Sequence, residues 1–388
     1  MSFLPIRILH IVDDFSTANT GVTNTVRQIA QWQAQHCEWV GVHTIGIVDI
    51  TPPAGVEVIS RAAHPRTPFW RYPVGGVAGM VDLIKQKNIT HLHIHEFWRA
   101  GFAVGMRAAR QAGIPVVLSP HGLTSPWALR KLGWKNRLKK FLYWNLFGRF
   151  CLSSHAALHA ITPLELEHMQ AFFGRRPQVI IPNAIDLSDP VYEVGDNGCQ
   201  SPARRIVFVG RLHPIKGVET LINAFSQARL DADWELIIVG PEEMPDYVEE
   251  LKALASNSPR AASIHFVGPR YGEEKRALLR DSWVVVVPSF TEVIGMVNLE
   301  AASLHTPTIT TTATGLTDWA SAGGVLVEPE VGGVRDAIEK AAAWTLEERL
   351  ERGRKARAQV EAVFSLEALG QAWLNFYTDI QAHGVRPR

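Results

Sequence analysis

The chain has 388 residues, of which 46% are hydrophobic and 20% are charged, so it has the composition of a globular protein with about two domains. This composition excludes a disordered chain, a collagen-like fibre and a small disulfide-stabilised scaffold. The three cysteines stand at long, unequal spacings that suit neither a disulfide framework nor a zinc site. We therefore expect a reducing, cytoplasmic compartment.

Neither a secretory leader nor a membrane span is expected. The apolar run at residues 6–12 is too short for the core of a signal peptide. The longest apolar stretch, residues 141–161, is interrupted by polar and basic side chains. A protein of this kind stays in the cytoplasm, either free or on the inner face of the cytoplasmic membrane.

Charge is divided unevenly along the chain. Residues 1–190 hold 19 Lys+Arg against 11 Asp+Glu, whereas residues 191–388 hold 20 against 27. No acidic residue stands between Phe97 and Thr162. Such an excess of positive charge predicts an anionic ligand or surface beside the first half of the protein.

Short apolar runs alternate with helix-period segments through the whole chain. The expected strands fall into two series: residues 7–12, 39–47, 91–95, 115–119 and 178–181, then 205–209, 235–239, 263–267, 283–287, 306–310 and 324–327. The expected helices are residues 22–35, 99–112, 163–173, 217–228, 247–255, 273–279, 297–304, 334–364 and 366–380. This alternation, with strands apolar on both faces, predicts an α/β protein with parallel sheets.

The pattern pauses at residues 182–204, which are rich in Asn, Asp, Gly, Ser and Pro, as linkers are. We therefore predict two Rossmann-like, doubly wound parallel-sheet domains facing each other across a cleft. The N-terminal domain is expected over residues 1–185, and the C-terminal domain over residues 186–365. The last helix, within residues 366–388, either packs on the second domain or crosses back to the first.

The strongest motif is GRLHPIKG at residues 210–217, which follows an expected strand and opens an expected helix. A glycine at such a turn lets the backbone approach a ligand closely. The helix N-terminus offers free N–H groups, and Arg211 and Lys216 add two positive charges. A diphosphate is the natural partner of this combination. A solvated basic turn at a helix start is the simpler alternative, and the strand–turn–helix context argues against it.

The second motif is EVIGMVNLE at residues 292–300, directly after the buried run 283–287. Glu292 is expected in the loop after a strand, and Glu300 in the helix that follows. Ligands of open α/β folds bind at the carboxyl ends of the strands, and carboxylates accept hydrogen bonds from sugar hydroxyls. Two ordinary helix glutamates are the alternative, which the preceding basic turn makes less attractive.

Together these motifs resemble those of a retaining glycosyltransferase of family 4, which has the GT-B fold. The resemblance extends over roughly residues 4–330, and the motifs occur in the family's order. IPNAID at residues 181–186 resembles the family's IPNGVD segment, and SPHG at residues 119–122 resembles its HG turn. Ala160-Ile161-Thr162 with Glu165 resembles the VSxxE segment before the last helix of the first domain.

The resemblance implies that the N-terminal domain is the acceptor side and that the C-terminal domain binds the nucleotide sugar. It also implies a role for each matching residue. Arg211 and Lys216 hold the leaving nucleoside diphosphate, and Glu300 binds the ribose hydroxyls. Glu292 faces the donor sugar, and His121 reaches the donor sugar and its phosphate. The donor-binding residues implied in this way are Gly21, Gly210, Arg270, Val293, Ile294, Gly295, Met296 and Glu300, with His121, Arg211, Lys216 and Glu292 as the catalytic set.

Several glycines of the family are missing here. Thr20 precedes Gly21 where two glycines are common, and Ala184 replaces the glycine after Pro-Asn. Gly240 and Gly315 likewise stand alone where the family often has a pair. These departures bear on loop details and on the choice of sugar more than on the reaction.

The family needs no metal for its chemistry, so we expect neither a metal nor a cofactor, the nucleoside-diphosphate sugar being a substrate. His91, His93 and His95 alternate along an expected strand and share one face. A buried parallel strand leaves little room for a metal there. A single histidine such as His121 is also more often packed than catalytic when it has no such context.

The segment at residues 127–150 holds seven basic residues, seven aromatic residues and no acidic one. Leu138, Phe141 and Leu142 mark one helical stripe, and Lys135, Lys139 and Lys140 lie off it. A basic amphipathic helix of this kind lies at anionic bilayers. The alternative is a packed helix with a solvated basic face. Nucleic acid is not expected, because no recognition module is present.

A membrane-facing first domain suits a saccharide or polyprenyl-diphosphate-saccharide acceptor. Residues 119–129 resemble enzymes of bacterial exopolysaccharide and lipopolysaccharide biosynthesis. The expected function is therefore transfer of a hexose from a UDP- or GDP-sugar to a hydroxyl of such an acceptor. Two other functions stay open: a GT-B sugar-nucleotide epimerase, and a catalytically inactive nucleotide-sugar-binding protein. The presence of both motifs argues against each of them.

Overall fold

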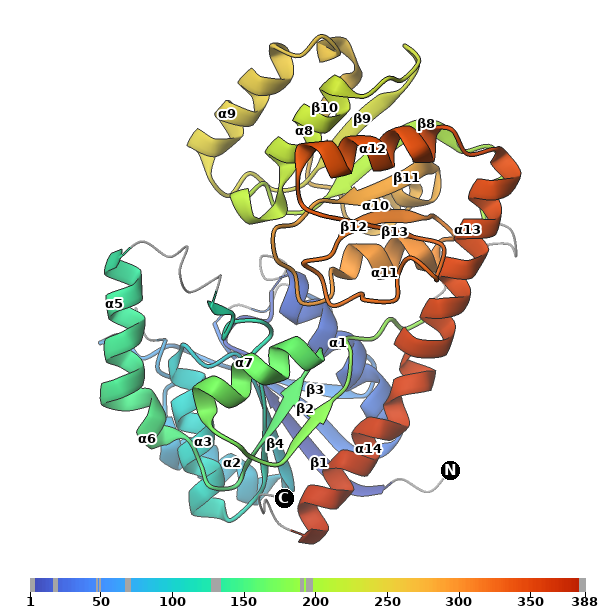
Figure 1. Cartoon of the computed structure of the whole chain (residues 1–388). Helices are drawn as coiled ribbons and strands as arrows, with labels where there is room; N and C mark the ends of the chain where they lie inside the picture. The colour runs from blue at the N-terminus through green and yellow to red at the C-terminus, as the bar shows by residue number, and fades with distance from the viewer. Residues whose placement is uncertain are drawn as a thin grey trace. The chain divides into compact units, whose positions relative to one another are not determined.

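The computed structural model describes residues 4–16, 20–46, 48, 50–66, 71–126, 134–188, 192 and 198–383. The chain divides into two compact units. Unit 1 comprises Met1–Ala184 together with Leu369–Arg388, and unit 2 comprises Ile185–Ala368. Each unit is built on its own parallel sheet (Figure 1). The predicted fold class, two parallel-sheet α/β domains, is confirmed.

Unit 1 has a seven-stranded sheet with the order β3-β2-β1-β4-β5-β6-β7. Its strands are β1 (Leu4–Ile11), β2 (Cys37–Ile45), β3 (Val56–Arg61), β4 (His91–His95), β5 (Val116–Ser119), β6 (Ala156–Ala160) and β7 (Gln178–Ile180). The chain winds outward from β1 to β3 and then returns to β4 beside β1. The order therefore reverses between β1 and β4, which is where open α/β sheets bind ligands.

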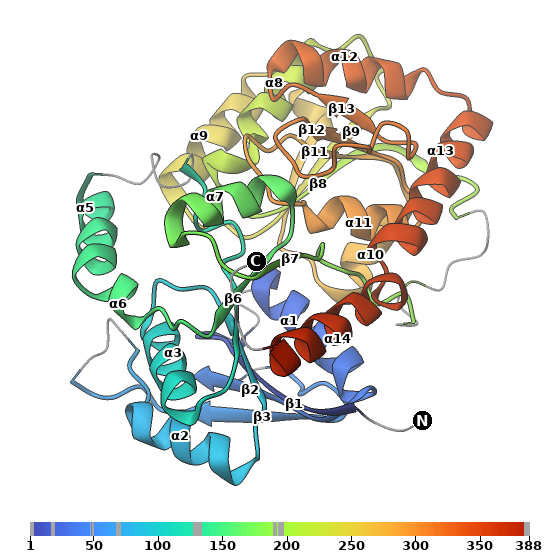
Figure 2. The ribbon, with the colours of Figure 1, turned by 60° about the horizontal axis from the view of Figure 1, so that its bottom comes forward.

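The helices of unit 1 are α1 (Thr20–Ala34), α2 (Gly76–Gln86), α3 (Ala100–Ala112), α5 (Trp134–Tyr143), α6 (Arg149–Cys151) and α7 (Pro163–Phe173), with a π-helical turn η1 (Trp144–Gly148). Helices α2, α3 and α7 pack on one face of the sheet through a core that includes Met80, Phe102 and Met169. Figure 2 shows α1 and α14 (Leu366–His383) on the opposite face. There α14 contributes Trp373 and Tyr377 to the second core of the unit.

Unit 2 has a six-stranded sheet with the order β10-β9-β8-β11-β12-β13. Its strands are β8 (Ala203–Val209), β9 (Glu235–Val239), β10 (Ile264–Gly268), β11 (Ser282–Val287), β12 (Thr308–Thr311) and β13 (Val325–Val327). Its helices are α8 (Val218–Gln227), α9 (Pro245–Ser256), α10 (Gly272–Arg280), α11 (Met296–Ser303), α12 (Val331–Ala342) and α13 (Leu346–Gln359), with short turns η3 (Pro214–Lys216), η4 (Ala261–Ser263) and η5 (Val360–Phe364).

Four elements differ from the sequence-based expectation. Strands β3 and β6 and helix α2 were not predicted. The helix predicted over residues 334–364 is instead two helices followed by a π-helical turn. The break occurs because Thr345 starts a new helix: its hydroxyl accepts a hydrogen bond from the backbone N–H of Glu348 at 3.1 Å. Within the described ranges, no helix combines the length and the apolar character that crossing a bilayer requires.

Candidate active site

Arg211 and Lys216 lie between the end of β8 and the start of α8. The connection is not a direct strand-to-helix turn, because the 3-10 turn η3 stands between the two elements. His213 caps η3 by accepting a hydrogen bond from the backbone N–H of Ile215 at 3.2 Å. Gly217 then adopts a left-handed conformation, φ 68°, from which α8 begins. The two cations therefore stand on a compact loop held at both ends.

Two glycines allow neighbouring loops to close on this turn. A Cβ atom on Gly217 would collide with the carbonyl oxygen of Pro288, and one on Gly240 would collide with that of Gly210. Both have positive φ, 68° and 157°, which side chains disfavour. The loops after β8, β9 and β11 consequently meet at the carboxyl edge of the sheet. A close approach of this kind is the physical reason for glycine at both positions.

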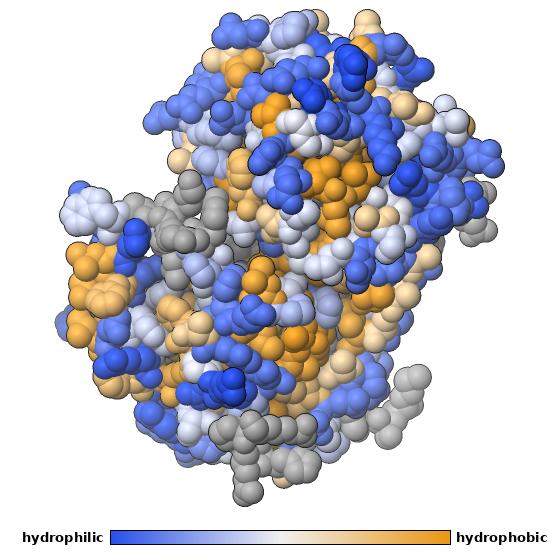
Figure 3. Space-filling view, in the orientation of Figure 1, coloured by the Kyte–Doolittle hydropathy of each residue, from blue (hydrophilic) through white to orange (hydrophobic). Residues whose placement is uncertain are grey.

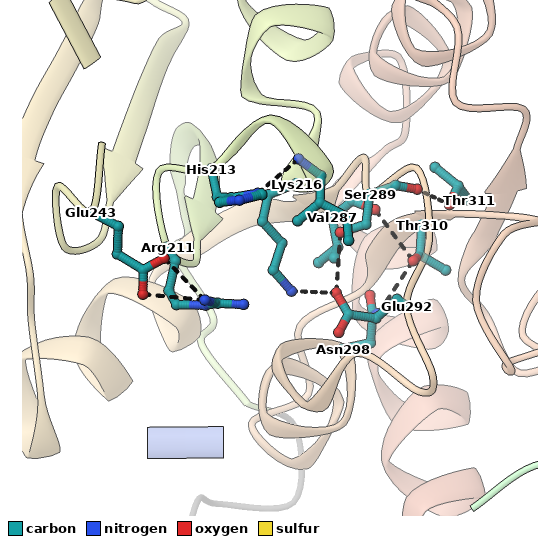
Figure 4. Close-up of polar contacts among 11 residues, drawn as sticks. Arg211, His213, Lys216, Glu243, Val287, Ser289, Glu292, Asn298, Thr310 and Thr311 are labelled. Carbon is teal, nitrogen blue, oxygen red and sulfur yellow. Dashed lines mark hydrogen bonds and ion pairs between the residues drawn. The ribbon is translucent and has the colours of Figure 1, made fainter. Parts of the chain in front are cut away.

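Lys216 and Glu292 meet at this edge. Lys216 Nζ lies 2.5 Å from Glu292 Oε2, and Ser289 Oγ donates to the same oxygen at 3.2 Å (Figure 4). The side chains are 19% and 20% exposed, so the pair is accessible from solvent without being fully hydrated. The structure thus brings together two residues that the sequence places in separate motifs.

Glu300 lies on α11 and forms an ion pair with Lys275 of α10, with Nζ 2.7 Å from Oε2. Its side chain is 16% exposed, so it is not an ordinary solvated helix glutamate. Lys275 does not belong to any of the motifs that the sequence shows. The sequence offers one signal for this contact: a lysine in the first turn of the helix expected 25 residues before Glu300. Such a spacing is common by chance, so it does not identify the ion pair.

Arg211 and Arg270 are the more exposed cations of the set. Arg211 Nη1 lies 3.0 Å from Glu243 Oε2, and its side chain is 51% exposed. Arg270 Nε lies 3.5 Å from Glu274 Oε2 at the N-terminal end of α10. Surface pairs of this kind are weak and exchange readily for another anion. Figure 4 shows Arg211 on the same loop as Lys216, with Glu243 beyond it.

The start of α11 offers free backbone donors. Gly295 is left-handed, φ 63°, and Asn298 is held in the first turn by a hydrogen bond from its Nδ2 to Thr310 Oγ1 at 3.2 Å. Among the described residues, the N–H groups of Val293, Ile294 and Gly295 donate to no other group. Met296 begins the helix. Unpaired N–H groups at a helix start form an anion-binding arrangement.

In unit 1, His121 follows β5 and is the residue with φ 53° in the SPHG segment. The next residue, Gly122, donates its N–H to Glu165 Oε1 at 2.5 Å, and Ile161 donates to Glu165 Oε2 at 2.7 Å. The buried Glu165 carboxylate therefore ties the turn that carries His121 to the start of α7. The SPHG segment and the segment that contains Glu165, which are separate motifs in the sequence, are thus joined by one carboxylate.

Gly21 differs from its expected place. It lies in the first turn of α1 and not in the loop after β1. The loop itself includes residues 17–19, which lie outside the described residues. Gly21 is helical because α1 begins at Thr20, two residues earlier than its apolar periodicity indicates.

One cluster among the described residues has the geometry to hold a metal ion. Ligand atoms of His10, His93 and His95 all lie within 4.8 Å of one another. Burial lowers the pKa of His10 to about 4 and that of His93 and His95 well below the usual value, so all three are neutral at pH 7. Both ring nitrogens of His10, His93 and His95 already form hydrogen bonds within the chain. The cluster is therefore satisfied as it stands.

The basic aromatic segment contains α5 from Trp134 onward, and residues 127–133 lie outside the described residues. Lys135 and Lys139 are exposed, whereas Lys140 lies against the Trp98 ring, 4.7 Å from its centre. The apolar stripe is exposed as well: Leu138 is 47% and Phe141 is 63% accessible. Figure 3 shows hydrophobic side chains gathered over α5. The alternative of a packed helix that exposes only its basic face does not describe this segment.

Comparison with known proteins agrees with the two-domain architecture. Residues 20–184 match the family profile described as glycosyl transferase 4-like domain, and residues 203–344 match that of the glycosyl transferases group 1. D-inositol 3-phosphate glycosyltransferase of Stackebrandtia nassauensis is 27% identical over 241 residues, which are 58% of this chain and 53% of that protein. The chain spans 33% to 53% of the length of the first curated relatives it matches.

Solved structures share the whole fold. HepE of Anabaena in complex with UDP-glucose superposes with a TM-score of 0.74 at 19% identity, covering 96% of this chain and 100% of that one. WaaG, a glycosyltransferase involved in lipopolysaccharide biosynthesis, superposes with a TM-score of 0.68 at 17% identity, covering 96% and 99%. At this level of identity the likeness establishes the fold alone.

The two parallel-sheet domains define a protein of the GT-B class. With both halves of the chain matched by glycosyltransferase domain profiles, the chain belongs to the GT-B glycosyltransferases of the family-4 type.

Proposed function

We propose that this chain is a retaining hexosyltransferase that takes its donor from the UDP- or GDP-sugars and works without a metal. The acceptor is a hydroxyl of a saccharide carried on a lipid, such as a polyprenyl diphosphate, in surface polysaccharide assembly. One observation carries the proposal: Arg211, Lys216, Glu292 and the free N–H groups before α11 gather at the carboxyl edge of one sheet. That set combines donors for a diphosphate with an acceptor for sugar hydroxyls.

The charges suit departure of a diphosphate. In glycosyl transfer, positive charge grows at the sugar carbon while negative charge grows on the leaving oxygen. Lys216, Arg211 and the N–H groups of residues 293–295 stabilise that negative charge where it develops. Arg211 exchanges its exposed partner Glu243 for the phosphate at little cost.

Neither Glu292 nor Glu300 is presented as an unpaired nucleophile. Glu292 accepts from Lys216 and Ser289, and Glu300 is paired with Lys275. A double displacement of the glycosidase kind needs a free carboxylate at the sugar carbon. We therefore propose attack of the acceptor hydroxyl on the face that the phosphate leaves, with the departing phosphate oxygen taking the hydroxyl proton. This route retains the configuration of the sugar.

The test is nucleotide release from UDP-, GDP- and ADP-sugars, first alone and then with short-chain prenyl-diphosphate sugars. Slow release from one donor, accelerated by the lipid-linked acceptor, is the expected result. Interconversion of the sugar nucleotide without a glycoside product identifies an epimerase instead. Nucleotide binding without any turnover identifies the inactive binding protein, and absence of nucleotide binding contradicts the proposed site itself.

We further propose that α5 places the acceptor side of the protein on an anionic membrane. The exposed Leu138, Phe141 and Leu146 provide apolar area, and Lys135, Lys139 and Lys140 provide attraction to anionic headgroups. Both are needed, because single basic residues contribute only about 1 kcal/mol each at such a surface.

Flotation with phosphatidylglycerol-containing vesicles tests the membrane proposal. The wild-type chain is expected to float with anionic vesicles and not with neutral ones. Replacing Lys135, Lys139 and Lys140 by Glu should abolish flotation. The matched control replaces three exposed lysines elsewhere, Lys85, Lys340 and Lys355, and should still float. Equal loss in both triple variants, or no flotation of the wild type, contradicts a specific membrane face.

A further inference from the structure

A row of polar side chains runs through the core of unit 1, on the sheet face covered by α1 and α14. His10 of β1 is paired in register with His93 of β4, and His95 lies two residues further along the same face. Ser119 ends β5 opposite His95, and His159 of β6 comes next. All five are at least 96% buried, so their hydrogen bonds cannot be exchanged for water.

One end of the row is fixed by a backbone carbonyl. His159 Nε2 lies 2.8 Å from the carbonyl oxygen of Ile181, which can only accept, so this nitrogen carries the proton. His159 Nδ1 is then an acceptor, and Ser119 Oγ, at 2.7 Å, donates to it. Ser119 Oγ in turn accepts from His93 Nε2 at 2.7 Å. His93 Nδ1 is left as an acceptor for the hydroxyl of Tyr377, also at 2.7 Å.

Gln33 of α1 connects these hydrogen bonds to a second series and fixes which atoms donate in it. With the Tyr377 proton given to His93, the Tyr377 oxygen accepts from Gln33 Nε2 at 3.4 Å. Gln33 Oε1 therefore faces His10 Nε2 at 2.7 Å, and that nitrogen donates. His10 Nδ1 accepts from His95 Nε2 at 3.0 Å, and His95 Nδ1 accepts from His121 Nε2 at 2.8 Å. Every step follows from the one before.

The opposite direction of protons is incompatible with the same geometry. Turning the Gln33 amide around reverses each bond in both chains. His159 Nε2 would then present a lone pair to the Ile181 carbonyl at 2.8 Å. Charging a histidine would relieve that clash, but burial lowers the pKa of His159 to about 4 and that of His121 to about 3. At neutral pH one arrangement is left.

We propose that this relay holds His121 as the neutral tautomer with its proton on Nε2, so that Nδ1 is a hydrogen-bond acceptor for a hydroxyl group of the sugar substrate. Among the described residues, His121 Nδ1 has no hydrogen-bond partner. A lone pair on Nδ1 repels phosphate oxygens and attracts hydroxyl protons, so His121 serves the sugar and not the phosphate. The substrate half of this inference rests on the proposed transferase function, whereas the tautomer does not.

The proposal makes Gln33 and Tyr377 positioning residues. Neither touches His121, yet both lie on the path that sets its proton. Tyr377 belongs to α14, so the C-terminal helix supplies a link of the relay in addition to its packing against the sheet. A metal bound by His10, His93 and His95 would instead require the hydrogen bonds of these rings to break, and this alternative is measured in the same experiment.

The experiment is nitrogen NMR of the full chain with labelled histidine at pH 7, in which protonated and bare ring nitrogens are resolved. The signals of His121 are assigned by their loss in His121→Asn. The expected wild-type result is a single neutral form with the proton on Nε2. Gln33→Met and Tyr377→Phe should each convert it to a mixture of both tautomers. Ile29→Val on α1 and Phe376→Leu on α14, both buried apolar neighbours outside the relay, should leave the single form unchanged.

A proton on Nδ1, a charged His121, or an unchanged tautomer in folded Gln33→Met and Tyr377→Phe would each overturn the relay. So would one equivalent of a transition metal found by elemental analysis of the purified chain. The substrate half is tested with whichever sugar nucleotide the chain hydrolyses. Gln33→Met and Tyr377→Phe should lower kcat while calorimetric affinity for the free nucleotide stays the same. Absence of any hydrolysis contradicts the proposed function and leaves the NMR result on the relay standing by itself.

Discussion

Lys216 and Glu292, 76 residues apart in the chain, form an ion pair with Nζ 2.5 Å from Oε2 at the carboxyl edge of the unit 2 sheet. The pair sets the position of the lysine before any ligand arrives, because a flexible side chain loses less freedom on binding when it is already held. A diphosphate carries more charge than one carboxylate and competes for the same ammonium.

The first prediction concerns the two cations of the β8–α8 loop. Lys216→Ala and Arg211→Ala should each lower turnover by about 10²–10³, the usual effect of removing one transition-state donor. Lys252→Ala is the matched control, since Lys252 is an exposed lysine of unit 2 paired with Glu242 and Glu249. Steady-state nucleotide release measures all three. Turnover in Lys216→Ala equal to that in the control would place the diphosphate elsewhere.

The second prediction separates Glu292 from Glu300. Glu300→Ala should weaken binding of free UDP or GDP on the order of 10- to 100-fold, because it removes a charged hydrogen-bond acceptor. Glu292→Ala should affect turnover more than it affects this binding, because its partner is the sugar. Calorimetry with the free nucleotide beside turnover at saturating donor measures the difference. Identical effects of the two substitutions would contradict the division of roles.

Lys275 provides a finer version of the same test. It contacts Glu300 and lies on α10, so Lys275→Met leaves the carboxylate in place and removes its orienting partner. Nucleotide affinity should fall, but by less than in Glu300→Ala. A larger loss in Lys275→Met would mean that the lysine itself contacts the nucleotide.

The third prediction concerns the loop that carries Lys216. Gly217→Ala should destabilise unit 2 by roughly 1–2 kcal/mol for the left-handed backbone, with a further cost for the contact with the Pro288 carbonyl. Gly332→Ala is the control, because Gly332 lies in α12 with open space around its Cβ position. Thermal unfolding compares the two. Equal stability would show that the loop can move aside, and nucleotide binding should then be unaffected too.

The positions of the two loops of the candidate site were predictable from the sequence because each motif is local. Arg211 and Lys216 share one turn, and Glu292 and Glu300 share one loop and helix. Lys275 and the relay were not predictable, since each depends on strands or helices that pair across many residues. Strand β6 was missed for a related reason: the buried His159 interrupts its apolar pattern. In an isolated sequence, a polar residue that is satisfied by long-range bonds looks the same as an exposed one.

The last prediction follows from the buried histidines of unit 1. Burial lowers the pKa of His10, His43, His91 and His159 to about 4, against 6.5 for an exposed histidine. Between about pH 4 and 6.5, the unfolded chain therefore binds more protons at these histidines than folded unit 1 does. The stability that these histidines contribute is complete above pH 6.5 and is lost as the pH falls toward 4, by up to about 1.4 kcal/mol per pH unit for each such group. The carboxyls of Asp13, Glu96 and Glu165 act in the opposite sense, since burial raises their pKa values, that of Asp13 to about 7, but unit 1 holds more histidines with a lowered pKa than such carboxyls.

Unit 1 should consequently open at mildly acid pH while unit 2 stays folded. His213 of unit 2 also has a lowered pKa, but it is only partly buried, whereas His10, His43, His91 and His159 of unit 1 are buried. Hydrogen exchange resolved by peptide at pH 7, 6 and 5, corrected for intrinsic rates, should show protection lost first in β1, β4 and β6. Peptides from β8 and β11 serve as the internal reference. Simultaneous loss in both sheets, or earlier loss in β8, would mean that the buried histidines do not control acid stability.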